Sequence, residues 1–88
     1  MTIWKYPVAV TEEFVVDMPK GARVLCVQVQ DGVPCIWALV NDDEHAIVVD
    51  RKFAVRGTGH DCDGLETATY VGTFQLRCGK LMFHLFEL

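Results

Sequence analysis

The sequence predicts an all-β domain, built as a small antiparallel barrel or sandwich of six to seven strands in meander order. Two observations lead to this prediction. Segments rich in apolar, β-branched and aromatic residues are separated by turn residues, at 22–30, 33–41, 46–56, 70–76 and 81–88. No segment has the apolar repeat of an amphipathic helix of any length. We therefore expect at most one or two short helical turns, at 12–18 and 63–68.

The length and composition predict a single domain spanning residues 1–88. A chain of 88 residues is too short to bury two separate cores. Its 51% of apolar and 23% of charged residues are typical of a folded globular protein. The mean hydropathy is +0.23, which is slightly apolar for a chain with so much surface. This value favours a homodimer or a face that binds a partner.

The N-terminal third predicts an edge strand followed by a turn. Residues 3–10 form an extended apolar segment that is interrupted by Pro7. Because proline has no backbone N–H to donate to a ladder, this strand is expected at an edge and bent at Pro7. Residues 14–16 are expected to be briefly extended. Residues 18–21 are expected to turn tightly, since Pro19 and Gly21 suit such a turn.

The clearest hairpin joins residues 22–30 to residues 33–41. Asp31 and Gly32 between them suit a two-residue type I′ turn, in which both residues need positive φ. Both strands are apolar on both faces, which is typical of a central, covered strand or of an interface. In strict alternation, one face of the first strand holds Leu25, Val27 and Val29, and the other face holds Val24 and Cys26.

The C-terminal half predicts a half-buried strand, a long loop and a second hairpin. Residues 46–56 alternate, so that one face is dry except for Arg51, and that face holds Ile47, Val49, Phe53 and Val55. No period survives over 57–67, which reads as the longest irregular loop. Residues 70–76 and 81–88 then form a hairpin across 77–80.

Charge and cysteine usage exclude several classes of function. The net charge is −4 and the eight basic residues are scattered, which argues against nucleic acid as the main ligand. The absence of a signal peptide and of a long apolar run predicts a protein that does not enter a membrane and stays in the compartment where it is made. The irregular spacing of the four cysteines predicts free thiols in a reducing compartment.

The loop at 57–64 is the segment whose composition most resembles a functional site. Its binding candidates are His60 and Asp61, since long loops on rigid sheets often carry binding residues. His60 and Cys62 are also competent metal ligands, although no chelating CxxC or HxxxH spacing is present. Cys62 with His84 leaves a thiol nucleophile open. The simplest alternative is a turn-rich connector, and we expect no cofactor, no metal and no catalytic residue.

Aromatic residues offer a different kind of site. Most aromatic side chains of a small domain belong to its core, but at interfaces Trp and Tyr carry much of the binding energy. Trp4 and Tyr6 share one face of the strand that Pro7 marks as an edge. We therefore expect Trp4 and Tyr6 to be the exposed anchors for a partner.

Several stretches resemble a family of small, uncharacterised proteins encoded by bacteriophages and prophages, with a start of the type MTIWKY. They are residues 1–6, 18–25, 37–40, 57–60 and 72–76. The resemblance transfers no activity and no functional residue. It implies an accessory protein that is made in the host bacterial cytoplasm during infection. Such proteins often bind and inhibit a host protein, including defence machinery such as CRISPR effectors.

Residues and resemblance together predict a non-enzymatic protein that binds a host or phage protein through a sheet edge or an aromatic patch. Pairing of sheet edges also predicts a homodimer. Two alternatives stay open at this point. One is a small metal-binding or thiol-dependent enzyme that uses the 57–64 loop, and the other is a minor structural protein of the virion.

Overall fold

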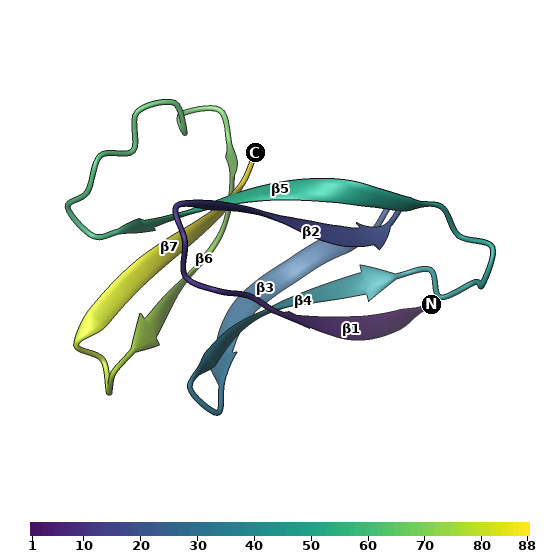
Figure 1. Ribbon diagram of the computed structural model, residues 1–88, viewed down its shortest axis with the longest axis horizontal. Coiled ribbons are helices and arrows are strands. Elements are labelled where there is room, and N and C mark those ends of the chain that lie inside the picture. The colour runs from purple at the N-terminus through teal and green to yellow at the C-terminus, as the bar shows by residue number, and fades with distance from the viewer.

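The computed structural model describes residues 1–88 and contains seven strands in two antiparallel sheets (Figure 1). The first sheet has the order β1-β4-β3 and the second the order β2-β5-β7-β6. The strand bounds are β1 Thr2–Pro7, β2 Glu13–Pro19, β3 Arg23–Gln30, β4 Val33–Val40, β5 Val48–Gly57, β6 Thr69–Leu76 and β7 Leu81–Glu87. The predicted all-β class is confirmed, and neither sheet closes into a barrel.

The strand order within the sheets differs from a simple meander. Only β3–β4 and β6–β7 are hairpins of consecutive strands, whereas β1 pairs with β4 and β2 with β5. Figure 1 shows the cause: the segment after β1 carries the chain to the opposite sheet, so that β1 and β2 lie in different layers. β2 is longer than the short extended piece expected from the sequence, because it pairs with β5 along its whole length.

The hairpin turn between β3 and β4 forms as expected. Asp31 has a φ of 51° and Gly32 a φ of 78°, so both central residues are left-handed as a type I′ turn requires. The prediction for the faces of β3 is wrong at two residues, Val24 and Leu25, because a bulge between Val24 and Cys26 shifts the alternation. As a result, Val24 packs against the core, and Leu25 is 39% exposed.

The core lies between the two sheets. Its largest fully buried side chains are Met18, Ile36, Val40, Phe53 and Leu85, which come from both layers. On β4 the even-numbered residues face this core, as the alternation predicts. On β5 the predicted dry face is confirmed at Phe53 and Val55, and Arg51 interrupts it.

Arg51 joins three segments of the chain at one end of the second sheet. Its Nη1 donates to the Ala22 carbonyl oxygen at 2.7 Å, and its Nη2 donates to Glu87 Oε1 at 2.9 Å. Its Nε also bonds the same carboxylate, so the pair is bidentate. Hydrogen bonding to Glu87 raises the pKa of Arg51 above its ordinary value. The charge on the otherwise dry face is therefore paired.

Two further observations concern the chain as a whole. All four cysteines are unpaired, with Cys35 buried, Cys26 half-buried, and Cys62 and Cys78 exposed. The structure contains no helix that could span a lipid bilayer.

Candidate protein-binding surface

The free edge of the first sheet is β1, which pairs only with β4. The Val8 N–H donates to the Pro34 carbonyl oxygen at 3.0 Å, so the even-numbered residues of β4 direct their backbone groups toward β1. Trp4 lies opposite Ala38, which is one of these even-numbered residues, so the backbone groups of Trp4 point toward β4. Because backbone direction alternates along a strand, the N–H and C=O groups of Ile3 and Lys5 point to the free edge. β1 thus offers backbone donors and acceptors to an added strand.

Pro7 occupies the edge strand that the sequence predicted for it. By the same alternation its nitrogen points away from β4, so the ladder loses no hydrogen bond at this position. The position of Pro7 is therefore compatible with the strand order, because a proline nitrogen that faced β4 would remove a hydrogen bond between the two strands.

The two aromatic candidates on β1 have different surroundings. Trp4 is 44% exposed, whereas Tyr6 is half-buried and packs against the core. The Tyr6 hydroxyl is buried without a hydrogen-bond partner, and desolvation by burial raises the pKa of Tyr6. Trp4 is thus available to a partner, and Tyr6 contributes to packing between the sheets.

The outer face of the first sheet, which points away from the core, is apolar. In register, Ile3 lies beside Leu39, and Trp37 beside Cys26. Ile3 is 57% exposed, while Trp37, Leu39 and Cys26 are half-buried. The bulge adds Leu25 to this surface. We call these five residues the apolar face: Ile3, Leu25, Cys26, Trp37 and Leu39.

The charged residues on the three strands of the apolar face are both basic. The strands β1, β3 and β4 contain Lys5 and Arg23 but no aspartate or glutamate. Lys5 crosses β4, since its Nζ donates to Gln30 Oε1 on β3 at 2.6 Å. The same ammonium lies 6.0 Å from the centroid of the Trp37 ring. In a chain with twelve acidic residues, this sheet is locally basic.

The 57–64 loop holds its polar residues through local hydrogen bonds. Asp61 Oδ1 accepts from the Asp63 N–H at 2.8 Å, and the Asp61 carbonyl oxygen accepts from Arg56 Nε at 3.2 Å. His60 is exposed, with its ring against Gly57, and the Cys62 thiol lies 3.5 Å from the His60 carbonyl oxygen. No group of three or more His, Cys, Asp and Glu side chains converges on one point. The loop therefore has the interactions of a turn-rich connector.

A polar chain on the second sheet was not predicted from the sequence. His84 Nε2 lies 2.7 Å from Thr58 Oγ1, and His84 Nδ1 lies 2.8 Å from Thr73 Oγ1. Thr73 Oγ1 lies 2.5 Å from the Tyr70 hydroxyl. Both imidazole nitrogens are thus satisfied, and Cys62 is not among their partners. The pairing of β7 with β5 on one side and with β6 on the other brings these residues together, and no local motif marks them.

The fold and this surface define a small all-β domain of two facing sheets, one of which leaves an apolar outer face uncovered. The model of a family described as a domain of unknown function, DUF7352, matches residues 1–88, and the chain belongs to this family. No curated protein and no solved structure matches the chain.

Proposed function

We propose that this protein is a non-enzymatic accessory protein that binds another protein through β1 and the apolar face. The observation that supports the proposal is the concentration of exposed and half-buried apolar side chains on the outer face of the first sheet, which no other layer covers. A patch of this kind, rimmed by polar residues, is typical of interaction sites. The free backbone groups of Ile3 and Lys5 extend this surface to the sheet edge, where Trp4, in register with the buried Ala38, presents its exposed part on the core-facing side.

The charge pattern defines the chemistry of the partner surface. Lys5 and Arg23 flank the apolar face, and no acidic residue lies on its three strands. Complementary surfaces associate faster and reject wrong partners. We therefore propose a partner surface that is apolar at its centre and acidic at its rim.

The biological setting of the proposal comes from the resemblance of residues 1–6 and the four other stretches to bacteriophage and prophage proteins. We propose that the partner is a host or phage protein in the bacterial cytoplasm, and that binding inhibits a host process such as a defence system. We also propose a homodimer in the absence of the partner, because antiparallel pairing of two β1 edges would join the two three-stranded sheets.

Affinity capture from lysates of a bacterial host tests the proposal. Ile3→Asp and Leu25→Asp place a charge at exposed positions of the apolar face, and Ile47→Asp is the matched control, since Ile47 is 66% exposed and lies outside this face. We expect the first two variants to lose the captured protein and the control to keep it, with Tm values close to wild type for all exposed sites. Capture that survives both substitutions would contradict the proposal.

Sedimentation velocity of the purified chain tests the homodimer. We expect a dimer that Ile3→Asp converts to a monomer, since a charge at the paired edge opposes close approach. A monomer at all concentrations of the wild-type chain would refute self-association without affecting the proposed binding to another protein.

A further inference from the structure

The two sheets each present a second free edge, β3 in one and β6 in the other, and these edges lie beside each other (Figure 1). No ladder joins them, since β3 pairs only with β4 and β6 only with β7. The outward backbone groups of both strands therefore face a common space. This arrangement is separate from the apolar face, which lies on the outer side of the first sheet.

The register identifies the outward groups of β3. In a two-residue hairpin, the residues that flank the turn form a hydrogen-bonded pair, which here is Gln30 with Val33. Backbone direction alternates along a strand, so the N–H and C=O groups of Val27 and Val29 point away from β4. They point toward β6, since a Cβ placed on Gly72 would lie 3.8 Å from the backbone nitrogen of Val27.

The same reasoning identifies the outward groups of β6. The Met82 carbonyl oxygen accepts from the Thr58 N–H at 3.3 Å, so Met82 directs its backbone away from β6. Its register partner Gln75 is therefore in a non-hydrogen-bonded pair, and the N–H and C=O of Gln75 point to the free edge. Thr73, two residues earlier, points the same way.

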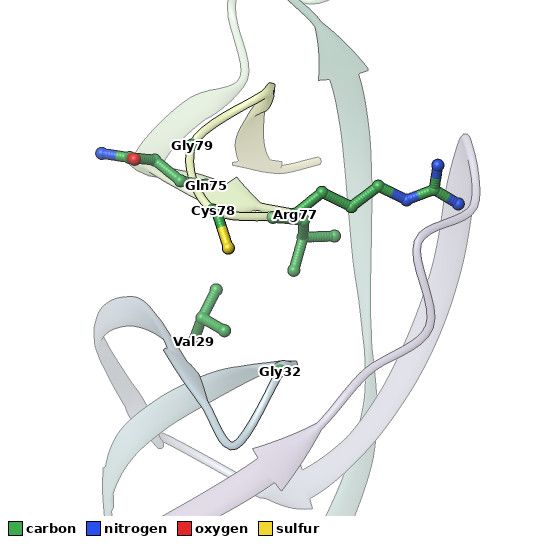
Figure 2. A pocket seen from close by; sticks show the side chains of 7 residues that line it. Val29, Gly32, Gln75, Arg77, Cys78 and Gly79 are labelled. Atoms are coloured by element: carbon green, nitrogen blue, oxygen red, sulfur yellow. The ribbon is translucent and has the colours of Figure 1, made fainter.

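These four residues line a groove between the strands. One cavity of about 220 Å³ is lined by both strands, including Val27, Val29, Thr73 and Gln75. A second cavity of about 520 Å³ adjoins it at the hairpin tips and shares Val29 and Gln75 with the first. In Figure 2, the Val29 side chain and the Cys78 thiol enter this space from opposite sides, whereas the Gln75 and Arg77 side chains point out of it. The groove is therefore open at the tips.

The other end of the groove is closed by close packing at Gly72. A Cβ on Gly72 would lie 2.9 Å from Val27 Cγ1, so the strands touch there because residue 72 has no side chain. From this contact the strands diverge toward the tips. The groove thus has one narrow end, one open end, and main-chain donors and acceptors along both walls.

We propose that this groove binds an extended peptide segment of a partner protein by strand addition. A guest strand pairs with its neighbour at about 4.8 Å and needs outward backbone groups, which Thr73 and Gln75 supply on one wall. Val29 and the buried Phe74 favour apolar guest side chains on the inner face, whereas the outer face is solvated. The guest is therefore a segment of alternating apolar and polar residues without proline. This inference does not depend on the proposed function.

Amide hydrogen exchange of the full chain tests the inference, with an acetylated and amidated peptide of three Val-Thr repeats between two lysines as the probe. We expect the amides of Val29, Thr73 and Gln75, which lie beyond the closed end at Val27, to exchange at least about tenfold more slowly when the peptide is bound. Phe74, whose amide already pairs with β7, should change little. Protection at Ile3 and Lys5 instead would place the guest on β1, and no protection at about 1 mM peptide would also overturn the inference.

A proline substitution provides the matched variant. Gln75→Pro removes the outward N–H and leaves the ladder to β7 unaltered, whereas Gln75→Ala removes the side chain and keeps the N–H. We expect peptide affinity to fall about tenfold or more for Gln75→Pro and to stay unchanged for Gln75→Ala. Equal affinity of both variants would overturn the inference. If Gln75→Pro does not fold, the protection pattern of the wild-type chain decides the question.

Discussion

Alanine substitution should change the stability of the protein differently at two glycines, Gly72 and Gly57, although the added Cβ would be equally close to a neighbouring side chain at both. A Cβ on Gly72 would lie 2.9 Å from Val27 Cγ1, and a Cβ on Gly57 would lie 2.9 Å from His60 Cε1. Val27 is 4% exposed, and its β-branched side chain has few rotamers to adopt. The His60 ring is exposed and can rotate into solvent. Neither glycine has a positive φ, so the backbone accepts alanine at both positions.

The expected magnitudes follow from two opposing effects. Overpacking a well-packed site costs about 1–3 kcal/mol. Replacing glycine with alanine also restricts the unfolded chain, which stabilises the fold by about 0.4–1 kcal/mol. We therefore expect Gly57→Ala to be neutral or stabilising by up to about 1 kcal/mol. Gly72→Ala should be destabilising by up to about 2.6 kcal/mol and about 1–3 kcal/mol less stable than Gly57→Ala, since the gain from restricting the unfolded chain is common to both variants.

Urea unfolding followed by tryptophan fluorescence measures both free energies, and thermal melts give a second reading. A loss of 1 kcal/mol corresponds to a fall in Tm of about 4–8 °C for a domain of this size. The m-value should stay constant, because neither change alters the surface exposed on unfolding. A Gly72→Ala variant as stable as Gly57→Ala would show that β3 and β6 are not in close contact, and the groove between them would lose its closed end.

Three further predictions concern the second sheet and the bulge. Arg51→Ala should lower the free energy of unfolding, measured in urea, by about 1.5–3 kcal/mol. Arg51→Lys should lower it less, because lysine keeps the charge but not the bidentate geometry, and equal losses for the two variants would contradict this. A hydrogen bond to Asp50 and repulsion from that carboxylate raise the pKa of the exposed Asp17. The ionised pair therefore lowers the stability of the folded state at pH 7, and this loss disappears as the pH falls through the raised pKa and Asp17 takes up a proton. Asp17→Asn should therefore raise Tm at pH 7, with an advantage that vanishes near about pH 3; a constant advantage at both pH values would refute the linkage. Val24→Ala should cost about 1 kcal/mol and Leu25→Ala less than about 0.5 kcal/mol, whereas strict alternation predicts the reverse order.

Local sequence signals were reliable where the chemistry is local. The Asp31-Gly32 turn formed because few residue pairs tolerate two left-handed conformations, and Pro7 lies on an edge because its nitrogen cannot donate. The bulge at Leu25 was not predictable, since it depends on how β3 aligns with β4. The doubly apolar strand β4 is central in its sheet, as predicted, and strand alternation could not decide whether its outer face is covered.

The candidate binding surfaces also combine features that the local sequence predicts with features that depend on neighbouring strands. Exposure of Trp4 follows from its place on an edge strand, but the packing of Tyr6 against the core depends on the opposite sheet. The chain Thr58–His84–Thr73–Tyr70 and the groove between β3 and β6 bring together residues that are distant in sequence. Periodicity carries no information about such neighbours, because it describes a strand and not the strand beside it.

Local patterns in the sequence were enough to predict that the chain is all-β, where most of its strands run, and which turns connect them. These features arise from backbone conformations and side-chain alternation that each segment contains within itself. The folded arrangement was needed to show which strands share a sheet, which apolar face stays uncovered, and which two edges border a groove. These features depend on contacts between segments, and their free energy is set by burial and hydrogen bonding that no segment achieves alone.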